Sequence, residues 1–368
     1  MDTYGMIFAG GFKKNENLFS QDEEMDKDFK FYVSGNLEYV NMEMVSGVTA
    51  FRDYAFYQCE NLENVIVPSS TMNIGAYAFS GCSNLSMVSI EGGTTDIGNF
   101  AFSGCTKLAD INIPSTITSI GERAFQNCTS LTEINLPSTI TSLGFGVFLG
   151  CSALVNISLS GGMTSIPQQF LEGCSSLEEV QIPERVASIG VSAFKGCSSL
   201  STVNIPRGVL SINSDTFKGC TSLEEIELPN TITTIYNNVF EGCTSLESIE
   251  IPDEVTSMGY NLFKGCTSLA QVKLPNAITI LQYSDFEDCS ALTEIDIPAT
   301  IEEIGNDVFK GCTLLESVTV NALNPPTLGT NVFSGTSNEL KIYVPSASVE
   351  AYQIASGWSE YDIQAIPV

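Results

Sequence analysis

Twelve cysteines are the residues of this chain that could do chemistry, and their spacing is constant. They follow a 23-residue period from Cys59, Cys82 and Cys105 through to Cys312. Thiols can form disulfides, bind a metal or act as nucleophiles, and each use has its own sequence pattern. Zinc sites place ligand pairs close together, as in C-x2-C, and a nucleophilic thiol needs an activating base. Neither pattern occurs here.

Amino-acid composition excludes several further classes of function. The chain has no histidine, which excludes His-based catalytic triads and His metal ligands. Its net charge is −28, with only 15 lysines and arginines, so it lacks the cations that nucleic acids and anionic membranes require. No apolar run approaches the roughly 18 residues of a membrane-spanning helix, and no signal peptide is visible at the start. We therefore expect no enzyme, no nucleic-acid partner and no membrane insertion.

The constant period predicts a solenoid, in which stacked repeats share one continuous core. In each repeat, a Val-x-Ile step places two apolar side chains on one face of a short strand, and a proline usually ends it. The stretch Thr118 to Gly121 predicts a second short strand. The stretch Glu122 to Cys128 predicts a tight helical turn that returns the chain to the next coil.

Stacking gives the cysteines a structural role. Coils in register lie about 4.8 Å apart, so the twelve cysteines would form a column inside the solenoid. Neighbouring Cα atoms at this spacing fall within disulfide range, but parallel side chains would strain the bridge dihedral. We therefore predict reduced, buried thiols that pack as small apolar groups.

The stretch "IPSTITSIGERAFQNCTSLTEINLP", Ile113 to Pro137, resembles the BspA-like (Treponema-type) leucine-rich repeat of bacterial surface proteins. The resemblance covers twelve units, from Cys59 to about Asn321. It implies a leucine-rich-repeat solenoid, a right-handed β-rich superhelix of 23-residue coils with two short strands and one helical turn per coil.

The resemblance also implies a division of the chain. Residues 1–58 would hold an N-terminal segment and a degenerate capping repeat, 59–322 the twelve repeats, and 323–368 a degenerate repeat and a C-terminal cap. Within the first part, Gly35 to Phe56 matches the repeat poorly, and residues 1–34 match nothing in it. Atypical end units are expected, because the open edge of a solenoid must be covered.

For function, the resemblance implies a non-enzymatic extracellular or cell-surface module for protein interaction and adhesion, which binds host or neighbouring-cell macromolecules. The ligand would be a protein or a glycan, the chain a monomer, and no cofactor is implied. The alternative is a structural or receptor-binding component of a cell envelope or a phage particle. The lack of a visible signal peptide favours that alternative.

Three tyrosines are the candidate ligand-binding residues. Tyr260 and Tyr283 occupy the same outward position in consecutive repeats, and Tyr236 lies one residue earlier in the repeat before. We expect their rings to form an exposed row about 5 Å apart, with Gln282 and Asp285 adding polar groups beside it. Exposed aromatic residues are enriched at recognition sites. Simple packing of the rings on one another is the alternative interpretation.

Charged residues form two further patterns. Outward acidic residues gather after the leucine of the first strand in several repeats: Glu178, Glu179, Glu224, Glu225, Glu227, Glu247 and Glu250. Calcium would need 6–8 oxygen ligands, and the D-x-D-x-D-G spacing is absent, so we favour a solvated face and expect no metal. In the turn before each cysteine, charges alternate from Lys218 to Lys310, which predicts ion pairs between coils.

Overall fold

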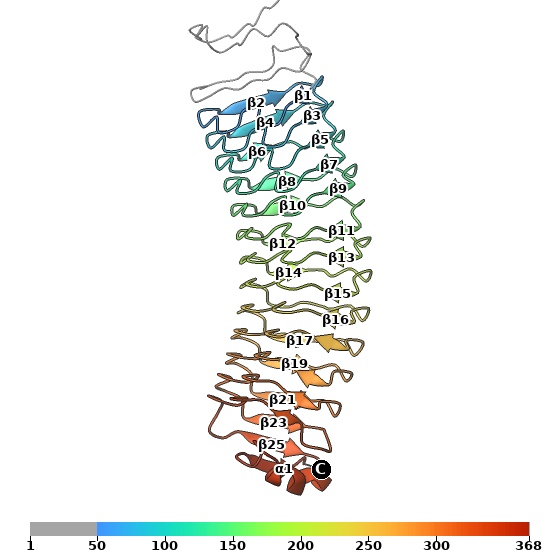
Figure 1. The fold of residues 1–368 in the computed structure, drawn as a ribbon, viewed down its shortest axis with the longest axis vertical. Helices are drawn as coiled ribbons and strands as arrows, with labels where there is room; N and C mark the ends of the chain where they lie inside the picture. The colour runs from blue at the N-terminus through green and yellow to red at the C-terminus, as the bar shows by residue number, and fades with distance from the viewer. Residues whose placement is uncertain (1–49, 368) are drawn as a thin grey trace, which may run out of the picture. The chain divides into compact units, whose positions relative to one another are not determined.

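The computed structural model of this chain describes residues 50–367. They divide between Gly162 and Met163 into two compact units. Each unit is built of successive coils that carry short parallel strands (Figure 1). The predicted segment 1–34 and most of the degenerate opening repeat lie outside the described residues. The solenoid predicted from the constant period is confirmed.

The N-terminal unit has two rows of strands, one for each strand of the coil. The first row contains β2 (Asn64–Val67), β4 (Met87–Ile90), β6 (Asp110–Ile111), β8 (Glu133–Asn135) and β10 (Asn156–Ser158). The second row contains β1 (Ala50–Phe51), β3 (Asn73–Ile74), β5 (Asp96–Ile97), β7 (Ser119–Ile120) and β9 (Ser142–Leu143), which form one five-stranded sheet.

The C-terminal unit repeats this arrangement. Its first row contains β12 (Glu179–Val180), β14 (Thr202–Val203), β17 (Ser248–Glu250), β19 (Gln271–Lys273), β21 (Glu294–Ile297), β23 (Ser317–Val320), β25 (Lys341–Val344) and β26 (Asp362–Ala365). Its second row contains β11 (Ser165–Ile166), β13 (Ser188–Ile189), β15 (Ser211–Ile212), β16 (Thr234–Ile235), β18 (Ser257–Met258), β20 (Ile280–Leu281), β22 (Glu303–Ile304) and β24 (Thr327–Leu328). The short helices η2 (Ser346–Ser348) and α1 (Val349–Ile354) lie between β25 and β26.

Pairing is parallel and follows the sequence period. Val65 of β2 lies opposite Val88 of β4, and Ile235 of β16 opposite Met258 of β18, so partners lie one period apart in the sequence. Where the first strand is short, an asparagine continues the pairing. The Asn112 side chain accepts a hydrogen bond from Ile90 N at 2.7 Å and donates one to Ile90 O at 2.8 Å. This outward amide therefore joins two coils as a backbone pair would.

The segment before each cysteine forms tight turns, where the sequence predicted one helical turn. Gln126 N donates to Arg123 O at 3.1 Å, and Cys128 N donates to Phe125 O at 3.2 Å. A helix cannot continue through this segment because Arg123 and Asn127 have positive φ angles of 49° and 58°. Backbone amides between these turns donate to the neighbouring coil instead, as from Phe125 N to Val147 O at 2.9 Å.

Phenylalanine rings form the most regular column of the core. In the N-terminal unit, the rings from Phe56 to Phe148 stack with centroids 5.1–5.5 Å apart. In the C-terminal unit, the rings from Phe194 to Phe333 stack at 5.4–5.9 Å. Leu171 takes the corresponding position in its own coil, where Phe170 fills the small position beside it, and both are fully buried. Offset stacking of this kind adds about 0.5–1.5 kcal/mol per pair beyond the burial of apolar area.

All twelve cysteines are buried thiols that form no disulfide, which confirms the packing role. The thiols also donate along each unit: the Cys128 Sγ lies 3.3 Å from Phe102 O, and the Cys266 Sγ lies 3.0 Å from Phe240 O. Burial raises the pKa of Cys197 to about 12. Such thiols are inert at neutral pH because the thiolate is the reactive form.

We expect a thiol reagent such as iodoacetamide to label almost none of the cysteines in the native protein and all twelve after denaturation. Burial both blocks access and suppresses the thiolate. Intact mass spectrometry before and after labelling measures the count. Six disulfides in the native mass, or rapid labelling without denaturant, would contradict the packing role.

The C-terminal end is covered by two large side chains. Tyr352 of α1 donates to Ala322 O at 2.8 Å, and the Trp358 Nε1 donates to Pro326 O at 2.7 Å. Both side chains are fully buried, and their rings meet edge to face at 5.1 Å. They satisfy backbone carbonyls at the last coils, which is what a cap on an open solenoid edge must do.

Candidate functional site

The three predicted tyrosines are exposed on the C-terminal unit. Tyr236, Tyr260 and Tyr283 expose 46%, 45% and 48% of their surface. Tyr236 occupies the position that is glycine in most coils, directly after the second strand. At Gly259, the same position one coil later, a Cβ would lie 2.6 Å from Asn237 N. Since the coils approach this closely, the Tyr236 side chain extends outward.

A shallow pocket of about 250 Å³ brings three of the five predicted residues together. Tyr236, Tyr260 and Gln282 line it, with Asn237 and Gly259 between them. Among residues 50–367, no ring contact joins Tyr236, Tyr260 and Tyr283, so the expected stacked row is replaced by separate rings. Tyr236 and Tyr260 border the pocket, and Tyr283 is not part of its lining.

Asp285 does not lie beside the rings on the surface. Its side chain is fully buried in the small inward position of its coil. The Gly259 amide donates to Ile235 O at 2.8 Å in the previous coil, whereas the corresponding Gln282 amide donates to the Asp285 Oδ2 at 2.7 Å. The Asp285 Oδ1 accepts from Leu262 N at 3.3 Å. Asp285 therefore replaces a backbone contact between coils and is not a ligand-binding group in this structure.

Burial of Asp285 has an electrostatic consequence. Removal from water raises the pKa of this carboxyl group to about 8, although the two backbone amides act to lower the pKa. Burial also acts to raise the pKa of Glu287, but the ion pairs with Lys264 and Lys310 outweigh it and lower the pKa to about 2. Two carboxyl groups two residues apart thus differ in charge at neutral pH.

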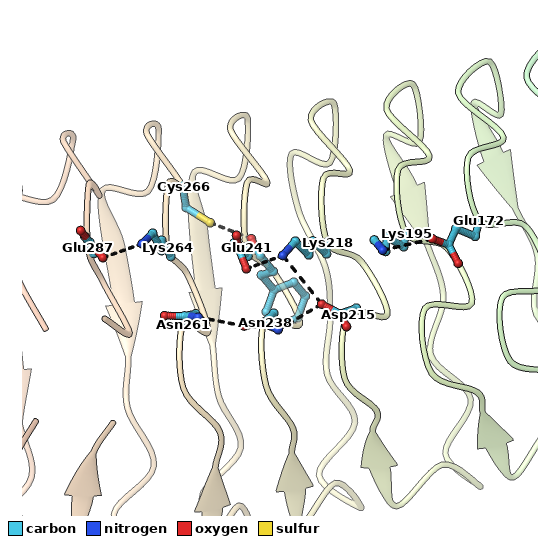
Figure 2. A network of polar contacts seen from close by, with 11 residues as sticks. Glu172, Lys195, Asp215, Lys218, Asn238, Glu241, Asn261, Lys264, Cys266 and Glu287 are labelled. Carbon is cyan, nitrogen blue, oxygen red and sulfur yellow. Dashed lines mark hydrogen bonds and ion pairs between the residues drawn. The ribbon is translucent and has the colours of Figure 1, made fainter. Parts of the chain in front are cut away.

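The alternating charges before the cysteines pair between coils, as predicted (Figure 2). Lys218 lies 2.8 Å from Glu241, and Glu287 lies 2.7 Å from Lys264 and 2.9 Å from Lys310. Most of these side chains are partly exposed, so each pair contributes about 0.2–1 kcal/mol. This network fixes neighbouring coils and offers no reactive group.

The acidic residues that gather at the first-strand row, such as Glu179 of β12 and Glu250 of β17, are all exposed. Across residues 50–367, no three His, Cys, Asp or Glu side chains converge on a position that could hold a metal ion. One of these residues, Glu250, pairs with Lys273 of the next coil. No helix within the described residues is long and apolar enough to cross a bilayer.

A second aromatic surface, which sequence reasoning missed, lies on the N-terminal unit. We name it the aromatic ridge and define it as Tyr54, Tyr57, Tyr77, Phe100, Arg123 and Phe145. Tyr54 stacks on Tyr77 at 4.8 Å, and Tyr77 on Phe100 at 4.7 Å, with rings within 5° of parallel. The signal was present in the sequence, because Tyr54, Tyr77 and Phe100 each lie at the same offset before a cysteine.

The ridge continues from rings to a cation. The Arg123 guanidinium lies 5.8 Å from the centre of the Phe100 ring and 5.0 Å from that of Phe145. Tyr57 closes the other end, meeting Tyr54 edge to face at 5.5 Å. Tyr54, Tyr57 and Phe145, at the two ends of the ridge, are exposed, and Tyr77, Phe100 and Arg123 between them are half-buried.

Comparison with known proteins identifies the repeat. The model of the "BspA type Leucine rich repeat region" matches residues 27–154, 95–224 and 210–341, which together span most of the chain. This chain belongs to the BspA-type leucine-rich repeat family. The resemblance stated from Ile113 to Pro137 is thereby confirmed. Leucine-rich repeats of this family form protein-interaction modules, and their scaffold is typically non-enzymatic.

Solved structures of BspA-type and other leucine-rich repeat proteins share the fold. A leucine-rich repeat protein from Bacteroides ovatus is 29% identical, covers 87% of this chain and 88% of its own, and superposes with a TM-score of 0.72. A leucine-rich cell surface protein from Faecalibacterium prausnitzii is 25% identical over 91% of this chain and 92% of its own, with a TM-score of 0.58. No curated protein sequence matches the chain.

Proposed function

We propose that this protein is a non-enzymatic, extracellular or cell-surface adhesion module that binds macromolecules of a host or of neighbouring cells. The observation that carries the proposal is the set of exposed aromatic side chains on a rigid backbone, which the ridge and the tyrosines around the Tyr236 pocket provide. Tyrosine supplies large contact area at low entropic cost and is enriched at binding hot spots. The Faecalibacterium prausnitzii relative, named a cell surface protein, supports the location.

The division of the chain belongs to the same proposal. We infer a twelve-repeat array over 59–322, flanked by an N-terminal segment at 1–58 and a C-terminal cap region at 323–368. The capping contacts of Tyr352 and Trp358 support the last boundary. The array would present the binding surfaces, and the flanking parts would protect its ends.

Binding to immobilised matrix proteins and neutral glycans tests the proposal. We expect the full chain to bind at least one member of such a panel, measured by biolayer interferometry. Tyr260→Ala combined with Tyr283→Ala should weaken this binding about tenfold, which corresponds to about 1.4 kcal/mol, because exposed rings contribute directly to the contact.

The melting temperature serves as the control for the double variant. The two rings are about half exposed and share no ring contact within residues 50–367, so we expect their loss to leave stability nearly unchanged. A large drop in melting temperature would show that the rings are packing residues. Unchanged affinity for an established ligand would remove Tyr260 and Tyr283 from the binding surface.

A further inference from the structure

The aromatic ridge breaks a local backbone rule in four consecutive coils. Tyr54, Tyr77, Phe100 and Arg123 have φ angles of 63°, 56°, 55° and 49°. This left-handed conformation suits Gly, Asn and Asp and is costly for bulky residues. The same position in later coils has Asp or Asn, which suit it, at Asp215 (57°), Asn238 (58°), Asn261 (56°) and Asp307 (56°), and has smaller polar side chains at Gln169 (56°), Ser192 (56°) and Ser284 (55°).

Large side chains at an unfavourable position indicate a role other than folding. Ring stacking offsets part of the backbone cost, but an asparagine would avoid the cost altogether. Stacking also fixes the rings before any ligand arrives, which reduces the entropy lost on binding. The ridge is therefore a preorganised surface.

Arg123 gives the ridge its chemical preference. In a chain of net charge −28, this arginine has no carboxylate partner among residues 50–367. Its Nε is buried without a hydrogen-bond acceptor, while the two rings hold the guanidinium in place. Arginine binds carboxylates through paired N–H groups in a fixed plane.

The groups around Arg123 also favour an anionic, acceptor-rich ligand. Stacked rings expose their edges, which have partial positive charge, and the three tyrosine hydroxyls can donate. Along the ridge, the Asp53 Oδ1 accepts from Ala76 N at 2.7 Å and the Asn99 Oδ1 accepts from Glu122 N at 2.8 Å, so these two oxygen atoms have partners within the protein. The net negative charge of the rest of the chain acts only weakly here, since salt screens exposed charges beyond about 8 Å.

We infer that the aromatic ridge binds an acidic polysaccharide, a chain of uronic-acid sugars that runs along the ridge with a carboxylate on Arg123. This inference rests on the proposed binding function and names the ligand class for one surface. The ring spacing of 4.7–4.8 Å is close to the length of one sugar in a linear chain, so successive sugars would meet successive coils. Each sugar offers oxygen atoms to the exposed ring edges and to the tyrosine hydroxyls. An extended peptide advances about 3.3 Å per residue and does not match this spacing.

The direct test uses polygalacturonate and hyaluronan as probes, with methyl-esterified polygalacturonate as the uncharged match. We expect the full chain to bind at least one acidic polymer in calorimetry at physiological ionic strength. Combined replacement Tyr54→Asn, Tyr77→Asn, Phe100→Asn and Arg123→Asn should weaken this binding at least about tenfold. Asparagine suits the backbone at these positions, so the variant should still fold.

Two further variants separate charge from packing. Arg123→Gln should lower affinity for the acidic polymer about tenfold and leave affinity for the methyl ester unchanged, since only the charge contact is lost. The matched control replaces the same position in a coil without a ring, as Gln169→Asn, and should bind as the wild type does. Equal loss for both polymers in Arg123→Gln would overturn the carboxylate contact.

The outcomes distinguish the inference from the proposed function. Binding of a matrix protein without binding of either acidic polymer would overturn the inference and leave the function standing. If poly-glutamate binds as tightly as the acidic polysaccharides, the ligand of the ridge would be an acidic peptide, and the assignment to a polysaccharide would be wrong. If the protein binds none of the polymers and no member of the matrix-protein and glycan panel, both the inference and the proposed binding function would be wrong.

Discussion

Replacing Phe217 with alanine is expected to lower the free energy of unfolding by about 3–5 kcal/mol. The Phe217 ring is fully buried and stacks between Phe194 at 5.6 Å and Phe240 at 5.9 Å. Alanine would leave a cavity that cannot collapse, because backbone hydrogen bonds hold the flanking coils at a fixed spacing. Urea denaturation followed by circular dichroism measures the change.

Phe217→Leu is the control for this prediction. Leucine occurs naturally at this position as Leu171, where the neighbouring Phe170 fills the remaining space. Phe217→Leu should therefore cost clearly less than Phe217→Ala, because part of the column stays filled. Similar losses for both variants would contradict the role of the ring column. In repeat proteins, coupling acts between neighbours, so Phe217→Ala could also split the unfolding transition in two.

The second large effect is a dependence of stability on pH that originates at Asp285. Its pKa is raised from 3.8 to about 8 in the folded protein. Between these values, the folded state holds a proton that the unfolded state has released. The stabilisation is therefore complete below about pH 4 and is lost as pH rises through 8, at about 1.4 kcal/mol per pH unit. The total is about 6 kcal/mol on this basis.

Asp285→Asn isolates this contribution, because asparagine does not titrate. We expect the wild type to be more stable than Asp285→Asn near pH 4, since the asparagine side chain can satisfy only one of the two backbone amides. The difference should shrink or reverse by pH 9. Denaturant melts of both proteins at pH 4, 6, 8 and 9 measure it, and a constant difference would refute the raised pKa. Glu287→Gln offers a comparison with the opposite trend, because the pKa of Glu287 is lowered to about 2.

The core could be predicted from sequence because its positions repeat. One side chain per coil at a constant offset from the cysteine, such as Phe125 or Leu131, must stack on its equivalents when coils are in register. The constant 23-residue spacing was therefore enough to predict the cysteine column, the phenylalanine column and the pairing of strands between coils. The same stacking predicted the ion pairs between coils, such as Lys218 with Glu241 and Lys310 with Glu287.

The surfaces were harder to predict because their positions vary from coil to coil. The row of rings expected at Tyr236, Tyr260 and Tyr283 did not form. Tyr236 is one residue out of register, and Tyr260 and Tyr283 share no ring contact within residues 50–367 although they are in register. Tyr236 and Tyr260 line a pocket instead. The aromatic ridge depends on a left-handed backbone at Tyr54 and Tyr77, and residue types do not reveal such a conformation where asparagine or glycine is absent. Asp285 was expected to add a polar group beside the rings, but its side chain is buried, and its backbone partners depend on the glycine that Gln282 replaces.

The constant register has a consequence for the evolution of repeat number. Since strand partners lie one period apart in most of the array, as for Ile235 and Met258, gain or loss of one whole repeat would leave every remaining side chain opposite an equivalent one. Recombination between similar gene segments produces such changes, and the solenoid would absorb them without refolding. Evolution can therefore lengthen or shorten the protein by whole coils, and each added or lost coil adds or removes one residue of the ridge. The number of ligand units that the ridge contacts would then be set by the number of repeats in the gene.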